Sequence, residues 1–299
     1  MRDKKRLVII DSNSLLHRAF HALPPLTTKS GEPTGAIYGF LLILFKALND
    51  LKANYVVACF DTKAPTFRHE KFEDYKAQRP KTPNEILLQL PKIKEILEKL
   101  KIPVFAKEGF EADDLIATIA TMAKNQSDNL EIYILSGDLD NLQLVDKITK
   151  VYTLGKGIKD TVLYDEGKVV SRFGVEPPSM IDFKALSGDP ADNIPGVPGI
   201  GKKTATELIQ KFGSVKNLYI EISQGMANIK PRIKDILIDN KKAALLSLEL
   251  VEMKKDVDIN FLLENCEFGK FDLKEVQEKL MAFDFNTLVN RLPLLLNHK

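Results

Sequence analysis

Short apolar runs alternate with longer amphipathic segments along the first half of the chain. The runs are rich in β-branched and aromatic residues and end at polar or turn-forming residues, which is typical of strands buried in a sheet. The segments between them carry apolar residues at helical spacing. This alternation favours an α/β fold with a central, mostly parallel sheet flanked by helices. The expected strands are residues 7–10, 55–60, 102–105, 130–135 and 150–154.

Helical patterns dominate the second half. Pro91 should kink or divide the helix that contains it, because proline lacks an N–H and clashes with the preceding turn. We divide the chain into a core at residues 1–186, with an insertion at about residues 62–82, and a helical region at residues 187–299. The expected helices are residues 17–23, 35–51, 83–100, 115–123, 141–145, 165–173, 177–186, 202–212, 231–239, 240–253 and 271–283.

Acidic residues recur just beyond the ends of the expected strands. In an open α/β sheet, ligands bind at the carboxyl ends of the strands. So many carboxylates could not stay ionised in one small volume without bound cations, and oxygen ligands without His or Cys indicate Mg²⁺ or Mn²⁺. The sequence therefore predicts a metal site. Its candidate ligands are Asp11, Asp61, Glu111, Asp113, Asp114, Asp138, Asp140, Asp189 and Asp192.

The acids at residues 111–114 also have a simpler interpretation. They begin a predicted helix, where negative side chains complement the helix dipole. Recurrence of acids after the other strands favours the metal site.

Charge and cysteine content refine this picture. The formal net charge is only +2, but setting aside nine candidate ligands leaves 32 acids against 43 basic residues. An acidic pocket within a basic surface suits a protein that binds a polyanion. The two cysteines have neither metal-site nor redox spacing, which fits a reducing cytoplasm. No apolar run reaches the ~20 residues needed to span a bilayer, so we expect a cytoplasmic protein without a membrane segment.

The insertion, which we call the arch segment (residues 62–82), mixes basic and aromatic residues without an apolar period. Such a surface can hold phosphates and stack on unpaired bases. A solvated surface loop is the alternative. The mixed residues are Lys63, Phe67, Arg68, Lys71, Phe72, Tyr75, Lys76, Arg79 and Lys81.

The most specific stretch is residues 193–201, which we call the glycine hairpin, followed by a predicted helix. Gly196, Gly199 and Gly201 allow close backbone approach. The free N–H groups of a helix start can bind a phosphate, and Lys202 and Lys203 add charge there. Such contacts hold a duplex without reading its sequence. The alternative is an ordinary turn between helices.

These motifs together resemble the flap endonuclease (5′-nuclease) family, as represented by the 5′–3′ exonuclease domain of bacterial DNA polymerase I. The resemblance covers essentially the whole chain, in order. It rests on Phe-Asp-Thr-Lys-Ala-Pro-Thr-Phe-Arg-His (60–69), Tyr-Lys (75–76), Glu-Ala-Asp-Asp (111–114), Gly-Asp-Leu-Asp (137–140) and Gly-Asp-Pro-Ala-Asp-Asn-Ile-Pro-Gly-Val-Pro-Gly-Ile-Gly (188–201).

The resemblance implies a PIN-like core, a helical arch and a C-terminal helix–three-turn–helix region that binds duplex DNA. It implies two Mg²⁺ or Mn²⁺ ions, and K⁺ at the hairpin. A tighter metal group would comprise Asp11, Asp61, Glu111, Asp113 and Asp114, and a looser one Asp138, Asp140, Asp189 and Asp192. The implied DNA contacts are Arg18, Arg68, Tyr75, Lys76, Arg79, Gly196, Gly199, Gly201, Lys202 and Lys203, with Lys76 also catalytic.

Two residues depart from the family pattern. His17 stands where the family usually has tyrosine, and Leu139 stands where it has lysine or arginine. Loss of a cation at residue 139 could weaken a phosphate contact, but it removes no metal ligand.

The function implied is a structure-specific 5′–3′ exonuclease and 5′-flap endonuclease. It would be a monomer that hydrolyses phosphodiester bonds near DNA 5′ ends, with RNA primer–DNA hybrids as further partners, in replication and repair. One alternative is an aspartyl-nucleophile phosphatase, since Asp11 ends a strand, although Asn13 stands where that class has a second acid. Another is a non-catalytic module that binds DNA structures.

Overall fold

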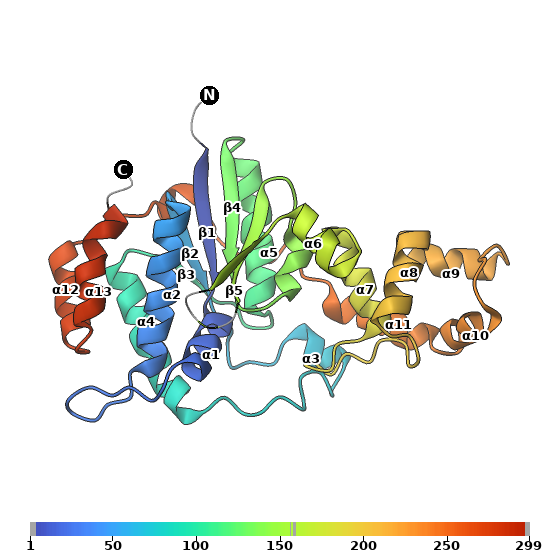
Figure 1. Ribbon diagram of the computed structural model, residues 1–299, viewed down its shortest axis with the longest axis horizontal. Coiled ribbons are helices and arrows are strands. Elements are labelled where there is room, and N and C mark those ends of the chain that lie inside the picture. The colour runs from blue at the N-terminus through green and yellow to red at the C-terminus, as the bar shows by residue number, and fades with distance from the viewer. Residues whose placement is uncertain (1–3, 156, 158–159, 297–299) are drawn as a thin grey trace.

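The computed structural model describes residues 4–155, 157 and 160–296, and a six-stranded sheet forms its centre (Figure 1). The order in the sheet is β3-β2-β1-β4-β5-β6; β1 to β5 are parallel and β6 is antiparallel to β5. The expectation of a mostly parallel sheet is confirmed, and β6 is a strand that the pattern did not predict. The strands are β1 (Lys5–Asp11), β2 (Tyr55–Cys59), β3 (Val104–Phe105), β4 (Leu130–Leu135), β5 (Thr149–Leu154) and β6 (Thr161–Tyr164).

Helices cover both faces of the sheet, because the central strands are apolar on both sides. Val8 and Ile10 of β1 belong to one apolar core with α1, α2 and α4, whereas Leu7 and Ile9 belong to another with α5. Successive side chains of a strand point to opposite faces, so an unbroken apolar run serves two cores. These helices are α1 (Ser12–Ala22), α2 (Gly35–Leu51), α4 (Asn84–Lys99), α5 (Ala112–Gln126) and α6 (Glu166–Phe173).

Gln89, a buried residue of α4, accepts hydrogen bonds from the first turn of α2. Its Oε1 accepts hydrogen bonds from the backbone N–H groups of Ala36 (2.9 Å) and Ile37 (3.1 Å). A helix cannot supply acceptors for the N–H groups of its own first turn. Replacing Gln89 by leucine should therefore leave two buried donors unsatisfied and lower the free energy of unfolding by about 2 kcal/mol.

Urea unfolding followed by circular dichroism measures this loss. Gln224→Leu, at an exposed position, is the matched control and should change the free energy by less than about 0.5 kcal/mol. Equal losses in the two variants would show that the Gln89 contacts contribute nothing.

Pro91 neither divides nor ends its helix, since α4 runs unbroken past it. Pro91 lies on the exposed side of α4. Leu87, whose carbonyl would accept the missing hydrogen bond, is also exposed, so water can take the place of the absent N–H.

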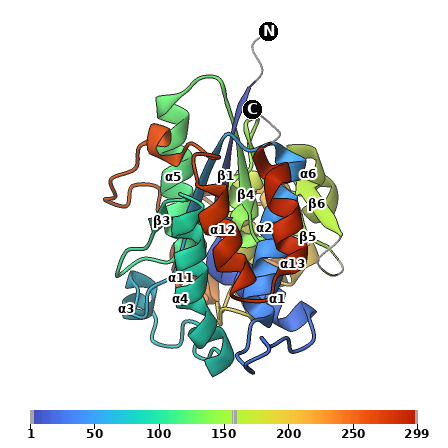
Figure 2. The same ribbon diagram turned by 90° about the vertical axis from the view of Figure 1, so that its left-hand side faces the viewer.

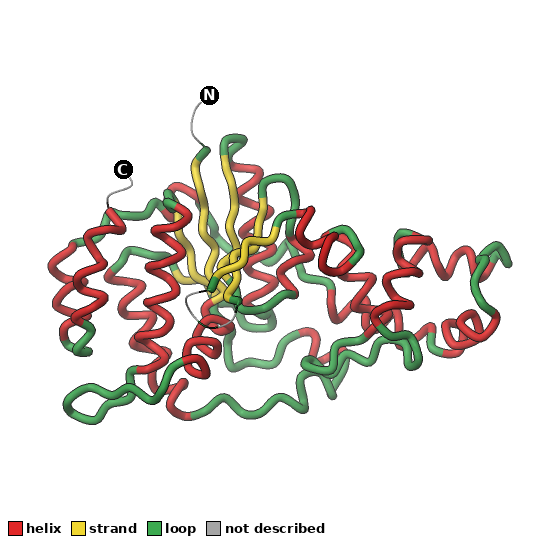
Figure 3. Tube along the Cα trace, in the orientation of Figure 1, coloured by secondary structure: helices red, strands yellow, loops and turns green. Residues whose placement is uncertain are grey.

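The second half of the chain divides in space. The helices α7 to α11 form a lobe beside the β6 side of the sheet (Figures 1 and 3). The helices α12 and α13 instead return to the opposite side, where they pack on α2 and α4 (Figure 2). The helices of the second half therefore do not all lie together. They are α7 (Met180–Ser187), α8 (Lys202–Phe212), α9 (Val215–Ser223), α10 (Pro231–Asp239), α11 (Lys241–Val251), α12 (Leu273–Met281) and α13 (Asn286–Arg291). Two of them, α9 and α13, at residues 215–223 and 286–291, were not predicted from the pattern.

The arch segment crosses beneath the carboxyl ends of the strands (Figure 1). Its only helix among the described residues is α3 (Phe67–Lys71); turns and extended chain make up the rest. The expectation of a helical arch therefore holds for one short helix only, as the lack of an apolar period in the segment explains. Within the described part of the chain, no helix is long and apolar enough to cross a membrane.

Candidate active site at the carboxyl ends of the strands

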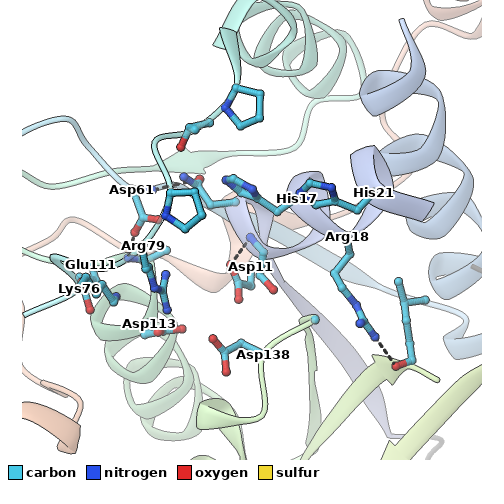
Figure 4. Close-up of a pocket in the computed structure, with 18 of the residues that line it drawn as sticks. Asp11, His17, Arg18, His21, Asp61, Lys76, Arg79, Glu111, Asp113 and Asp138 are labelled. Atoms are coloured by element: carbon cyan, nitrogen blue, oxygen red, sulfur yellow. Dashed lines mark hydrogen bonds and ion pairs between the residues drawn. The ribbon is translucent and has the colours of Figure 1, made fainter. Parts of the chain in front are cut away.

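A cleft of about 1110 Å³ opens at the carboxyl edge of the sheet. The helix α1 forms one wall, the end of the arch segment forms another, and the first turn of α5 and the end of β4 form the floor (Figure 4). Five of the nine predicted ligands line this cleft. They are Asp11, Asp61, Glu111, Asp113 and Asp138.

Asp11 ends β1 and caps α1. Its Oδ1 accepts a hydrogen bond from the backbone N–H of Ser14 at 3.1 Å, and its Oδ2 accepts one from Ser136 Oγ at 2.6 Å. Burial, together with the nearby charge of Asp138, raises the pKa of Asp11 to about 7. The strand-to-helix turn thus holds a carboxyl group in a place where its negative charge is costly without a cation.

Asp61 and Asp113 are fixed by the start of α5. Asp61 Oδ1 accepts a hydrogen bond from the backbone N–H of Ala112 at 2.7 Å. Asp113 Oδ1 accepts one from Asn141 Nδ2 at 3.1 Å. Burial at the cleft floor, and the charges of Asp11 and Asp138, raise the pKa of Asp113 well above its ordinary value.

Glu111 is the N-cap of α5 and contacts the arch segment. Its Oε1 lies 2.6 Å from Lys76 Nζ, and its Oε2 accepts a hydrogen bond from Tyr75 Oη at 3.1 Å. Burial opposes the charged carboxylate, but Lys76 and Arg68 hold the pKa of Glu111 below its ordinary value. Tyr75 is itself only 3% exposed, so the structure gives this predicted DNA contact the role of a buried partner to Glu111.

Lys184 of α7 is a site residue that the sequence pattern did not reveal. Its ammonium contacts Asp140 Oδ1 and lies 2.7 Å from Asp189 Oδ2. Burial and the charge of Asp138 raise the pKa of Asp140 to about 6, whereas Lys184, against the effect of burial, lowers the pKa of Asp189. The only sequence signal for Lys184 is its place about one helical turn before the pair Asp189 and Asp192. Lysines are common on helices, so this signal is weak.

Asp192 does not line the cleft, but with Asp140 it lines a small second pocket that Glu111 and Asp113 also line. Arg79 Nη2 contacts Asp192 Oδ1, and Lys76 Nζ lies 3.8 Å from Asp192 Oδ2. Lys76 therefore stands between Glu111 of one predicted metal group and Asp192 of the other, whereas Asp138 lines the cleft with the acids of the first group. Within the described residues, no three acids, histidines or cysteines lie close enough together to enclose an ion as they stand.

Asp114 is corrected from metal ligand to structural anchor. It is completely buried, and both carboxylate oxygens are occupied: Arg68 binds them at 2.7 and 2.8 Å, and the N–H groups of Glu111 and Lys254 donate to them. No lone pair faces the cleft. Arg68, predicted to contact DNA, is 2% exposed and donates further hydrogen bonds to the carbonyls of Leu250 and Glu252, so it too is corrected.

The glycine hairpin precedes α8 as predicted, but its glycines differ in role. Gly196 is buried, and its N–H donates to Ser247 Oγ at 2.9 Å, so its assignment as a DNA contact is wrong. Gly199 and Gly201 are exposed, and a side chain added at Gly201 would meet nothing within 4 Å. Lys202 and Lys203 are exposed in the first turn of α8.

Arg18 and His17 occupy the α1 wall of the cleft. Arg18 donates a hydrogen bond to the carbonyl of Leu154 at 2.8 Å, which stretches it across the cleft edge. Partial burial, with His21 and Arg79 nearby, lowers the pKa of His17, which favours its neutral form. The end of the arch segment, with Arg79, faces them from the opposite wall.

The donor set fits hard divalent cations. Every predicted ligand offers a carboxylate oxygen, which Mg²⁺ and Mn²⁺ prefer. The raised pKa values of Asp11 and Asp113 show a local excess of negative charge that a cation would relieve.

Two family models match the chain. One describes the N-terminal resolvase-like domain of 5′-3′ exonucleases and matches residues 6–174; the other describes their C-terminal SAM fold and matches residues 175–274. The chain belongs to the 5′-3′ exonuclease family. The resemblance stated from the motifs is confirmed at this level.

Relatives agree with this family assignment. The 5′-3′ exonuclease of Aquifex aeolicus is 38% identical over 96% of this chain and 95% of its own length. DNA polymerase I of Bacillus subtilis is 40% identical over 98% of this 5′-3′ exonuclease family member. The chain spans about a third of the length of the DNA polymerase I relatives that it matches.

Solved structures share the fold of this 5′-3′ exonuclease family member. The flap endonuclease of bacteriophage T5, solved with DNA and metal ions, is 20% identical with a TM-score of 0.67. The match covers 98% of this chain and 99% of that one. At this identity the likeness concerns the fold.

Proposed function

We propose that the chain is a structure-specific 5′–3′ exonuclease and 5′-flap endonuclease. One observation carries the proposal: five of the predicted carboxylates of this family member line one cleft whose walls carry cations. Acids on the floor suit divalent cations, and cations on the walls suit the phosphates of a DNA strand. We infer that its substrates are DNA with 5′ ends or flaps and RNA primer–DNA hybrids, and that it acts as a monomer.

Two Mg²⁺ or Mn²⁺ ions would be held by the acids of the cleft floor and of the Lys184 cluster. Such ions supply an activated water and neutralise charge on the phosphate that is transferred. The proposed ligands are Asp11, Asp61, Glu111, Asp113, Asp138, Asp140, Asp189 and Asp192.

The chain's own residues bind and orient the scissile phosphate. Lys76, held 2.6 Å from Glu111, adds positive charge where negative charge grows during the displacement. Arg18 of α1 and Arg79 of the arch segment both line the cleft and would bind phosphates of the strand. These contacts set the position of the backbone without reading the bases.

We assign the nuclease core to residues 1–186, with the arch segment at residues 62–82. Duplex binding belongs to the part of residues 187–299 nearest the glycine hairpin, where exposed lysines begin α8. The helices α12 and α13 lie apart from it, against α2 and α4. A K⁺ ion at the hairpin is part of the same proposal.

Incubation of labelled 5′-flap DNA with the protein and Mg²⁺, and then with EDTA, tests the function. Cleavage with Mg²⁺ that EDTA stops is the expected result. A phosphatase would release phosphate from p-nitrophenyl phosphate and leave the flap intact. A non-catalytic module would bind the flap without cleaving it in either condition.

Gly201→Val tests whether the glycine hairpin and the start of α8 bind duplex DNA. Valine fits here sterically, since Gly201 has φ −84° and open space around it, but its branched side chain would hold a phosphate away from the N–H groups of α8. Affinity for a plain duplex should fall roughly tenfold, the equivalent of one charge-assisted hydrogen bond. Fluorescence anisotropy with Ca²⁺ in place of Mg²⁺ measures it. Affinity for a short single strand should not change, and an equal fall for both would contradict the assignment.

A further inference from the structure

The arch segment is fastened to the loop that leads into the glycine hairpin. The backbone N–H of Lys76 donates to the carbonyl of Asp192 at 3.0 Å. The Nε of Arg79 donates to the carbonyl of Ala191 at 3.3 Å. The two proposed phosphate-binding cations of the arch segment therefore take their positions from a loop that belongs to the other lobe.

The side chain of Asn193, the first residue of the glycine hairpin, makes two hydrogen bonds to the arch segment. Its Nδ2 donates to the carbonyl of Asp74 at 2.8 Å, and its Oδ1 accepts a hydrogen bond from Gln78 Nε2 at 3.3 Å. Asn193 thus brackets Lys76 with one hydrogen bond before it and one after it in the chain. The neighbouring Asp192 side chain also contacts both sides of Lys76, through Tyr75 Oη at 3.5 Å and through Arg79.

The backbones of the two residues are unusual in the same way. Lys76 has φ 57° and Asn193 has φ 56°, both in the left-handed region. Asparagine enters this region readily, whereas lysine does so less readily, and the other two described lysines that do so, Lys52 and Lys101, stand just after helix ends. The conformation that points Lys76 toward Glu111 therefore depends on the contacts that Asn193 and Asp192 make.

Asn193 is in turn rigidly joined to the start of α8. Asp189 and Ile194 pair through two backbone hydrogen bonds of 3.0 and 2.9 Å, which close the turn that carries Asn193. Gly188 and Gly196 pack backbone to backbone, so closely that a side chain at Gly196 would lie 2.3 Å from the nitrogen of Gly188. The hairpin and its preceding turn must therefore move as one body.

We propose that Asn193 is a positioning residue that couples duplex binding at the glycine hairpin to the placement of Lys76. The inference rests on the proposed function and deepens it: the nuclease would hold its arch cation in the active position most firmly when a duplex occupies the hairpin. Single strands alone would be cleaved more slowly, because without a bound duplex the glycine hairpin and the turn that carries Asn193 are held by their intramolecular contacts alone.

Hydrogen exchange tests the coupling without any cleavage. A plain blunt duplex is added in EDTA, and exchange is followed in peptides that cover residues 74–79. In the parent protein the duplex should slow exchange there. In Asn193→Gly, which keeps the left-handed backbone and removes both side-chain bonds, it should not. Asn228→Gly, at an exposed position in the same lobe, is the matched control and should behave as the parent.

Kinetics gives the second measurement. The single-turnover rate on a 5′-flap substrate is divided by the rate on a single strand of the same 5′ sequence. Asn193→Gly should lower this ratio roughly tenfold, as expected for two lost hydrogen bonds, while the affinity for plain duplex stays within about twofold. A residue that only stabilises the fold would lower both rates together and leave the ratio unchanged.

The outcomes separate the two proposals. If the parent binds duplex but its arch segment gains no protection, or if Asn193→Gly keeps both the protection and the ratio, the coupling is overturned and the proposed function stands. If the parent binds no duplex, the proposed function fails and the coupling fails with it.

Discussion

Asp113→Asn should remove cleavage almost completely and yet stabilise the metal-free protein. The amide keeps the shape of the carboxyl group but withdraws an anionic oxygen from the cleft floor, where metal charge stabilisation is worth several kcal/mol. A loss of at least roughly 10³-fold in the single-turnover rate follows. Binding of flap DNA should persist, because Asp113 is proposed to contact metal and not phosphate.

The gain in stability follows from the sign of the pKa shift. Burial and the charges of Asp11 and Asp138 raise the pKa of Asp113 in the folded protein. At neutral pH its ionised form therefore costs folding free energy, and a neutral side chain removes that cost. The melting temperature in EDTA should rise, whereas the increase on adding Mg²⁺ should be smaller than in the parent.

Asp128→Asn, at an exposed position, is the matched control for both measurements. It should cleave and melt as the parent does. Near-normal cleavage by Asp113→Asn at saturating Mg²⁺ would remove Asp113 from the proposed ligands.

Arg68→Met should produce the largest loss of stability among the changes considered. The guanidinium binds both oxygens of Asp114, and both residues are buried. Without it, the Asp114 carboxylate stays in the interior with only backbone N–H partners, and breaking such a pair costs roughly 3–5 kcal/mol. Arg68 also joins α3 to the end of α11 through the carbonyls of Leu250 and Glu252, so those acceptors lose their partner too.

Urea unfolding measures the loss, and Arg232→Met, at an exposed arginine, should change stability by less than about 0.5 kcal/mol. The double variant Arg68→Met with Asp114→Leu should recover part of the loss, because it removes the unpaired charge. A loss below about 1 kcal/mol for Arg68→Met would contradict the anchor role. A lower duplex affinity in fully folded Arg68→Met would instead restore Arg68 as a DNA contact.

The sheet and most of its helices could be predicted because their signal is local. The boundaries of α2, β4, α8 and α10 match the pattern, since each apolar face is buried by tertiary packing in the way that its spacing requires. The strand β6 carries only four residues on one edge of the sheet and lacks such a signal.

The candidate site could be predicted in part, because position after a strand locates Asp11, Asp61 and Asp138 at one edge. It does not tell which neighbouring acid faces the cleft. Asp113 and Asp114 differ by 100° of helix rotation, which turns one toward the cleft and the other toward Arg68. Which way the helix faces is decided by the packing of α5 against the sheet.

Long-range partners were the least predictable feature. Lys184 and Asn193 contact residues far away in the sequence, and each belongs to a common residue type with no periodic signal. Only the fold brings Asn193 to Asp74.

The return of α12 and α13 to the first half of the chain has a consequence for biosynthesis. These helices complete the apolar core on α2 and α4 through Val276, Leu280 and Leu288. While the ribosome translates residues 101–267, that apolar face has no cover. At bacterial elongation rates this exposure lasts roughly ten to thirty seconds. We therefore expect this apolar face to stay accessible to chaperones that bind apolar segments until α13 has emerged.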